Sequence, residues 1–317
     1  MNLIFAGTPD FALPTLEALL GSRHTVRLVV TQPDRPAGRG RHPVAPPVKT
    51  LAMARGVPLI QPESINRPEA VERLRAEAPD AIIVIAYGKR LTVRVLRLPR
   101  LGCYNIHASL LPKFRGAAPI THAILAGERE TGVTLQRMAA QIDAGAIVAQ
   151  RSIPIGPEET AGELFDRLAA LAGEMILPAL DAIENGTVVE RTQNAAGVTE
   201  APPLEKASGR VPWHLPARAL CDFIRGMTPW PGAFTMYAPR DGRPAARLIL
   251  LAARPADCPD AATPGTVLRA GDSLIVAAGE GCIEVLRLKP EGGRAMEARA
   301  WLHGHAVQQG DAFRGEA

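Results

Sequence analysis

The chain has 317 residues, 47% of them hydrophobic and 21% charged, with a formal net charge of +4 at pH 7. This length suits two domains better than one, and the apolar content is sufficient for packed cores, which excludes a disordered chain. No apolar run approaches a membrane span, no export signal precedes the first expected strand, and the four cysteines show no metal-ligand or disulfide spacing. We therefore expect a cytoplasmic protein with reduced thiols, no metal and no membrane partner.

The first segments alternate between strand and helix patterns. Residues 2–7 (NLIFAG) and 26–30 are expected to be strands, and residues 13–20 a helix with leucines on one side. This opening resembles a Rossmann-type α/β unit. The G-x-G-x-x-G phosphate loop is absent, however, so we reject a dinucleotide site.

A stretch rich in proline, glycine and arginine follows the second strand and reads QPDRPAGRGRHPVAPPVK. No acidic residue lies between Asp34 and Glu63. The basic residues of this stretch are Arg35, Arg39, Arg41 and Lys49. Its prolines and glycines predict a long, mobile loop without regular structure. Arginine pairs well with phosphate, so the loop suits an RNA backbone, while its composition alone is also typical of a solvated insertion.

The most informative stretch, NIHASLLPKFRGAAPI, begins on an expected strand over residues 103–107 that follows a buried strand over 81–86. Residues i and i+2 of a strand point to one face, so Asn105 and His107 would present their side chains together. The proline at 112 ends the strand, and ligands of open parallel sheets bind at that end. An amide can stabilise an oxyanion and an imidazole can move a proton, which indicates chemistry on a carbonyl. For a lone Asn-x-His, the favoured interpretation would be that Asn105 caps a turn and that His107 is a core histidine with its hydrogen bonds satisfied.

This stretch resembles the active-site signature of the folate-dependent formyltransferases, in which Asn-x-His-x-Ser-Leu-Leu-Pro, Arg-Gly and a later proline recur. The resemblance implies a third catalytic residue, an aspartate in a later loop, and Asp143 in IDAGAI stands at that place. Without the resemblance, Asp143 would be interpreted as a turn residue. The resemblance also implies a folate-binding set that comprises Tyr87, Gly88, Ser109, Leu110, Leu111, Pro112 and Gly116.

Two further strings, GTPDFA at the start and QPDRPAGRG in the basic loop, are similar to those of the methionyl-tRNA formyltransferases within that family. This similarity implies 10-formyltetrahydrofolate as formyl donor, initiator methionyl-tRNA as acceptor, and a monomeric enzyme. It also implies that the basic loop binds tRNA through Arg35, Arg39, Arg41 and Lys49. Two alternatives stay open: a formyltransferase acting on an amino sugar nucleotide, and an RNA-binding protein that kept the fold without catalysis.

The remainder of the chain predicts one long helix and a second domain. Thr160 to Glu163 forms a capping-box pattern that opens a helix to about Glu184, which Gly173 and Pro178 should break or kink. Five short β-rich runs after residue 210 predict an antiparallel barrel. Trp230, in MTPWPGAFT, is expected to be a core aromatic.

We thus predict an α/β fold with a Rossmann-like, mostly parallel sheet, the formyltransferase fold, followed by a smaller OB-like β-barrel. The catalytic domain is expected to span residues 1–185. Residues 186–209, which are polar and rich in proline, alanine and glycine, are interpreted as a linker. Residues 210–317 are expected to form the barrel and to assist tRNA binding.

Overall fold

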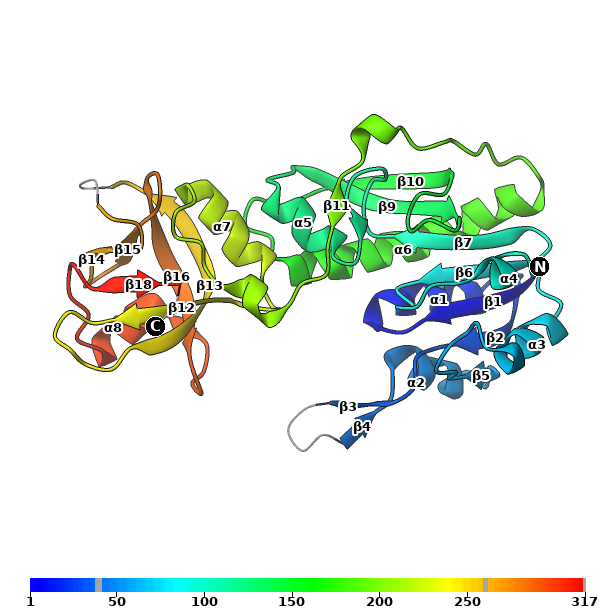
Figure 1. The fold of residues 1–317 in the computed structure, drawn as a ribbon, viewed down its shortest axis with the longest axis horizontal. Coiled ribbons are helices and arrows are strands. Elements are labelled where there is room, and N and C mark those ends of the chain that lie inside the picture. The colour runs from blue at the N-terminus through cyan, green and yellow to red at the C-terminus, as the bar shows by residue number, and fades with distance from the viewer. Residues whose placement is uncertain (38–41, 259–261, 316–317) are drawn as a thin grey trace. The chain divides into compact units, whose positions relative to one another are not determined.

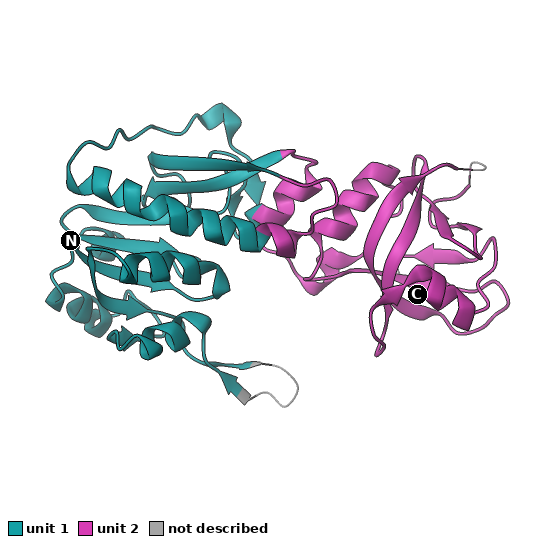
Figure 2. Ribbon diagram, turned by 180° about the vertical axis from the view of Figure 1, so that it is seen from behind, with its two compact units in different colours: residues 1–119, 130–154, 165–202 teal, residues 120–129, 155–164, 203–317 magenta. Residues whose placement is uncertain are grey.

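The computed structural model describes residues 1–37, 42–258 and 262–315 (Figure 1). Two compact units are coloured in Figure 2. Unit 1 comprises residues 1–119, 130–154 and 165–202, and unit 2 comprises residues 120–129, 155–164 and 203–317. Residues 186–202 of the predicted linker therefore group with unit 1.

Unit 1 is built on a seven-stranded sheet with the order β10-β9-β7-β6-β1-β2-β5. The strands from β7 to β5 pair in parallel, whereas β9 pairs antiparallel with both β7 and β10. The expected Rossmann-like, mostly parallel sheet is thereby confirmed. The strands are β1 (Asn2–Gly7), β2 (Thr25–Val30), β5 (Leu59–Ile60), β6 (Ala81–Ile85), β7 (Gly102–His107), β9 (Glu130–Arg137) and β10 (Ile147–Pro154).

Helices pack against this sheet and contact side chains from alternate positions of its strands. Ile4 of β1 and Ile82 of β6 share one buried cluster with Val71, Leu74 and Val95 from two helices. Burying an aliphatic side chain of this size contributes about 1.5–3 kcal/mol, so the cluster fixes the strands that carry the site. The helices that begin in this part of the chain are α1 (Leu13–Leu20), α2 (Pro47–Ala54), α3 (Pro68–Ala76), α4 (Val93–Leu96), α5 (Pro119–Leu125) and α6 (Ala161–Glu184).

The long helix α6 runs without the break expected at Gly173 or Pro178. Packing explains the glycine at position 173, since an added Cβ would lie 3.0 Å from the Pro14 carbonyl oxygen. The glycine permits close approach and does not end the helix. The capping box is confirmed, because Thr160 N–H donates to Glu163 Oε2 at 2.9 Å and Glu163 N–H donates to Thr160 Oγ1 at 3.3 Å.

The proline-rich basic stretch is not wholly irregular, contrary to expectation. Strands β3 (Arg35–Ala37) and β4 (His42–Val44) form a two-stranded antiparallel ribbon that pairs Pro36 with Pro43. Proline is tolerated because an isolated two-stranded ribbon has only edge strands, whose outer N–H positions need no partner. Figure 1 shows the ribbon extending from the part of unit 1 that carries α2.

Unit 2 contains the expected antiparallel barrel, with the strand order β14-β15-β16-β13-β12-β18. A bridge between Thr266 and Ala312 brings its two ends together, so the sheet nearly closes on itself. Two helices pack with it, α7 (Ala217–Gly226) and α8 (Ala298–Gly304). The strands are β12 (Ala233–Ala238), β13 (Ala246–Ala256), β14 (Val267–Arg269), β15 (Leu274–Ala277), β16 (Cys282–Pro290), β17 (Met296–Glu297) and β18 (Ala312–Arg314).

Two expectations for unit 2 are wrong. Trp230 is 54% exposed, because Trp213 and Trp301 already fill the core, at 6% and 1% exposure. Cys258 and Cys282 form a disulfide, although reduced thiols were expected. The pairing of Ala256 with Cys282 between β13 and β16 explains this, because it brings Cys258 close to Cys282.

Among the helices of the described ranges, none is both long and apolar enough to cross a bilayer.

Candidate active site

Asn105, His107 and Asp143 meet at the carboxyl end of β7. The first two occupy i and i+2 positions of that strand, and Asp143 lies in the turn between β9 and β10. Asn105 Nδ2 is 3.5 Å from Asp143 Oδ1, and His107 Nδ1 is 3.5 Å from Asp143 Oδ2. The His107 and Asp143 side chains are only 7% and 10% exposed, so water screens their interaction weakly. The three residues selected from the sequence therefore form one cluster.

The Asp143 carboxylate is held by further donors. Gly116 N–H donates to Oδ2 at 3.0 Å, and Gln136 Nε2 donates to Oδ1 at 2.9 Å. Gly116 has φ +121°, and an added Cβ would lie 2.6 Å from the Ala201 carbonyl oxygen, so only glycine fits there. The carboxylate is thus fixed in direction by the signature segment on one side and by β9 on the other.

His107 has a hydrogen-bond acceptor at each ring nitrogen. Its Nε2 lies 2.8 Å from the Phe114 carbonyl oxygen, and its Nδ1 faces Asp143. Because a carbonyl only accepts, Nε2 carries the proton of the first bond. An imidazolium satisfies both acceptors, and the neutral ring satisfies only one. The geometry therefore suits a residue that holds and releases a proton beside a carboxylate.

Tyr87 and Gly88 follow β6, the strand next to β7. The Tyr87 side chain is 1% exposed, and burial raises the pKa of its hydroxyl to about 12. Its carbonyl oxygen accepts hydrogen bonds from Thr8 Oγ1 at 3.2 Å and Gln32 Nε2 at 3.1 Å. Gly88 is exposed. A ligand at this strand end would therefore contact backbone of Gly88 and not the Tyr87 ring.

The signature residues after β7 mostly shape the turn. Ser109 Oγ donates to the Lys113 carbonyl oxygen at 2.6 Å, and Leu111 N–H donates to Thr134 Oγ1 at 3.1 Å. Both Ser109 and Leu111 are buried, whereas Leu110 and Pro112 are half-buried. A role of these four residues in folate binding stays a prediction.

The predicted tRNA-binding residues have different environments. Arg39 and Arg41 lie outside the described residues. Lys49 Nζ contacts both Asp34 carboxylate oxygens, at 2.8 and 2.7 Å. Hydrogen bonds from Gln61 and then Lys49 hold the pKa of the Asp34 carboxyl below its usual range. Arg35 is 63% exposed, and its guanidinium lies 3.9 Å from the exposed Glu63 carboxylate. Lys49 is therefore engaged at the base of the ribbon, while Arg35 is accessible.

Two glutamines at the site, Gln136 and Gln193, were not predicted from the sequence. Gln136 links Asp143 to the loop backbone, since its Oε1 accepts from Gly145 N–H at 3.1 Å. Its position two residues after Thr134, on the opposite face from Val133 and Leu135, was a usable signal. Gln193 contacts the same loop, but it lies in the predicted linker, where no pattern marked it.

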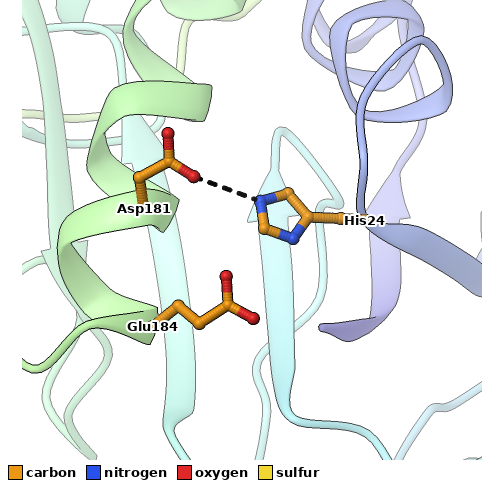
Figure 3. Close-up of side chains that lie close together, drawn as sticks. All are labelled: His24, Asp181 and Glu184. Carbon is orange, nitrogen blue, oxygen red and sulfur yellow. Dashed lines mark ion pairs between the residues drawn. The ribbon is translucent and has the colours of Figure 1, made fainter.

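One group in the described ranges has side chains spaced like metal ligands: His24, Asp181 and Glu184 (Figure 3). Arg23 lies 2.8 Å from Asp181 and 2.5 Å from Glu184, and the Met1 amino group lies 3.4 Å from Glu184. These two positive groups offset the two carboxylates, so little negative charge is left to attract a cation. Burial lowers the pKa of His24. We interpret the group as an ion-pair network that joins α6 to the residues before β2.

Comparison with known proteins places the chain in a family. A family model described as formyl transferase matches residues 1–180, and one described as formyl transferase, C-terminal domain, matches residues 203–306. The chain belongs to the formyl transferase family. The methionyl-tRNA formyltransferase of Methylococcus capsulatus is 44% identical over 307 residues, which cover 97% of this chain and 98% of that relative. That of Thiobacillus denitrificans is 46% identical over 311 residues, with 98% of both chains covered.

Solved structures share the fold at lower identity. The N-formyltransferase from Helicobacter canadensis, in complex with folinic acid and dTDP-3-aminofucose, aligns with a TM-score of 0.65 and 16% identity. That alignment covers 89% of this chain and 98% of that chain. HypX from Aquifex aeolicus, in complex with tetrahydrofolic acid, aligns with a TM-score of 0.60 and 20% identity, over 95% of this chain and 46% of that one. At these identities the likeness establishes the formyltransferase fold alone.

The site predicts a large effect from removing the Asp143 charge. Asp143→Asn keeps the shape and removes the charge that faces His107, so kcat should fall about 100-fold or more with little change in melting temperature. Steady-state formyl-transfer assays and thermal melts measure both quantities. Asp166→Asn, at an exposed position of α6, is the matched control and should behave as wild type. Near-normal turnover of Asp143→Asn would exclude the proposed group of three residues.

Proposed function

We propose that this chain transfers the formyl group of 10-formyltetrahydrofolate to the α-amino group of initiator methionyl-tRNA. The product, N-formylmethionyl-tRNA, would serve translation initiation in the cytoplasm. One observation carries the proposal: identity of 44–46% to methionyl-tRNA formyltransferases over 97–98% of the chain. The convergence of Asn105, His107 and Asp143 supports an active enzyme over a binding protein that lost catalysis.

The reaction needs no nucleophile from the protein. Once the acceptor amine is neutral, it attacks the formyl carbon, and the folate nitrogen leaves. Cys103, the thiol on β7, is not suited to attack, because burial raises its pKa to about 12. The protein therefore contributes positioning, charge stabilisation and proton transfer.

Charge that develops on the formyl oxygen needs a hydrogen-bond donor. Asn105 Nδ2 carries two N–H groups, and only one is directed at Asp143, at 3.5 Å. We assign the other to the formyl oxygen. A single donor of this kind contributes about 100- to 1,000-fold in kcat. His107 can donate as well, but only by exchanging the Phe114 carbonyl for the oxyanion, because that carbonyl binds its Nε2 proton in the structure.

Asp143 and His107 together would accept the proton that the amine loses. The carboxylate lies 3.5 Å from His107 Nδ1 and is fixed by Gly116 and Gln136, so it can orient the ring and balance its positive charge. Transfer to the pair, directly or through one water molecule, and from there to the departing folate nitrogen leaves a neutral amide and neutral tetrahydrofolate. The arrangement thus couples attack at the carbon to removal of the amine proton.

The donor fits the edge of the sheet where these residues lie. β6 and β7 are parallel neighbours, with Val84 paired to Asn105, so the exposed Gly88 and the half-buried Asn105 both lie near the carboxyl ends of these two strands. A flat ring that bonds backbone groups suits such an edge. We assign folate binding to this backbone, to Leu110 and Pro112, and to the turn that Ser109, Leu111 and Gly116 shape.

The basic ribbon would bind the tRNA. In the basic stretch that contains the ribbon, Arg35, Arg39 and Arg41 supply positive charge, and arginine pairs bidentately with phosphate. Lys49 would act indirectly, because its ion pair with Asp34 fixes the base of the ribbon. We assign residues 210–317 an assisting role in tRNA binding.

The choice of acceptor tests the proposed function. With 10-formyltetrahydrofolate supplied, kcat/KM for methionyl-tRNA should exceed that for a nucleotide-linked amino sugar by at least about 1,000-fold, since the rival substrate lacks the phosphate backbone that binds the ribbon. Transfer of labelled formyl groups to each acceptor measures the ratio. Preferred transfer to the amino sugar would instead favour the rival function and overturn this one.

The ribbon gives a second test. If Arg39 and Arg41 contact tRNA phosphates, replacing both with alanine should raise KM for tRNA and flatten the plot of log affinity against log salt by roughly 0.7 to 0.9 per contact. Folate affinity should stay level. Arg75→Ala/Arg94→Ala is a matched control, because both arginines already pair with Glu72. An unchanged KM and salt slope in Arg39→Ala/Arg41→Ala would remove the ribbon from tRNA recognition.

A further inference from the structure

Residues 190–201, here called the strap, run beside the candidate active site. They fall between the two matched family segments, which end at residue 180 and begin again at residue 203. Arg191 exchanges both backbone hydrogen bonds with Ile147, at 2.8 and 2.9 Å. Further along, β11 (Glu200–Ala201) pairs in parallel with β8 (Arg115–Gly116) of the signature segment. The strap is therefore bound to both segments that carry the site.

Gln193 makes the central contact of the strap. Its Nε2 donates to the carbonyl oxygens of Asp143 and Gly145, each at 2.8 Å. Its Oε1 accepts from Arg115 Nε at 3.1 Å and from a terminal Arg115 nitrogen at 2.7 Å. The residue is 9% exposed. A side-chain amide has two donor hydrogens and two acceptor positions, so the whole hydrogen-bonding capacity of the Gln193 side chain is used.

These contacts reach the backbone of residues in an unfavourable conformation. Asp143 has φ +49° and Phe114 has φ +59°, the left-handed region, which costs a residue with a side chain about 1–3 kcal/mol. Gln193 binds the carbonyl of Asp143, and Thr199 Oγ1 accepts from Phe114 N–H at 2.8 Å. Phe114 in turn provides the carbonyl that binds His107 Nε2. The strap thus constrains the backbone behind both His107 and Asp143.

We propose that Gln193 is a positioning residue for formyl transfer, which sets the direction of the Asp143 carboxylate by holding the backbone of its loop. The proposal rests on the proposed function for its assay. Among the residues that the structure describes, the Gln193 side chain donates only to backbone carbonyls and accepts only from Arg115, so it acts through Asp143 and does not touch the reacting atoms. The segment that joins the two family domains is therefore part of the catalytic apparatus.

Gln193→Glu is the sharpest test. A glutamate still accepts from Arg115, which preserves folding, but it cannot donate to the two carbonyls and repels them. We expect kcat to fall about 10- to 100-fold, because small misplacements of catalytic groups have effects of this size, while KM for both substrates stays within about threefold. Asn194→Ala is the matched control in the same strap, since the Asn194 side chain caps Ala196 N–H and bonds no residue of the Asp143 loop, all of which the structure describes. It should keep wild-type kcat.

Thermal melts and folate titrations accompany the kinetics. A loss confined to kcat, with unchanged folate affinity and a melting temperature close to wild type, supports positioning. A kcat within twofold of wild type, or a loss that appears mainly in KM or follows the melting temperature, overturns it. Failure of wild-type protein to formylate methionyl-tRNA would count against the proposed function only. The ratio of Gln193→Glu to wild type on whichever amine is accepted would still test Gln193.

Discussion

Four groups from different parts of the chain meet the Asp143 carboxylate: the Asn105 amide, the His107 ring, the Gly116 N–H and the Gln136 amide. The carboxylate is 10% exposed, so its charge interacts strongly with these neighbours and costs free energy unless it is bonded. Each donor reduces that cost and restricts the orientation of the carboxylate. The geometry of Asn105 and His107 relative to a substrate carbonyl therefore depends on where this one group points.

The fold brings these groups together by simple means. Parallel pairing of β6 with β7 places Asn105 and His107 at a strand end, and antiparallel pairing of β9 with β10 returns Asp143 to the same edge. Neither pairing fixes the left-handed backbone at Asp143, which has φ +49°. The strap supplies that constraint from a segment far along the chain. The geometry of the candidate site is thus maintained by contacts distant in sequence.

Much of this arrangement was accessible from the sequence. Apolar runs and their spacing predicted the sheet and barrel. The signature identified Asn105 and His107, the family resemblance added Asp143, and the three residues do lie together. Gln136 was overlooked although its place on the strand face opposite Val133 and Leu135 can be read from the sequence. Gln193 could not be found, because a side-chain amide that bonds loop backbone leaves no periodic pattern. Trp230 was misassigned for a related reason: local composition does not show which tryptophans the core has room for.

The pattern of basic residues does not show which of them have an acidic partner in the fold. Charge alone grouped Lys49 with the arginines of the ribbon, yet Lys49 pairs with Asp34, and only a tertiary structure reveals such a partner. Conversely, residues 186–202 looked like a linker because they are polar and lack hydrophobic periodicity. Their backbone groups bond to the signature and to Ile147, where β10 begins, and sequence patterns of side chains do not report such bonds.

A double-mutant cycle between His107 and Asp143 tests the central claim most directly. Single-turnover rates of formyl transfer to methionyl-tRNA would be compared for wild type, His107→Gln, Asp143→Asn and the double variant. If the two side chains act as one unit, the double variant should be about as slow as the slower single variant, because either change already disables the pair. Losses that multiply would show that His107 and Asp143 act independently and would contradict the account.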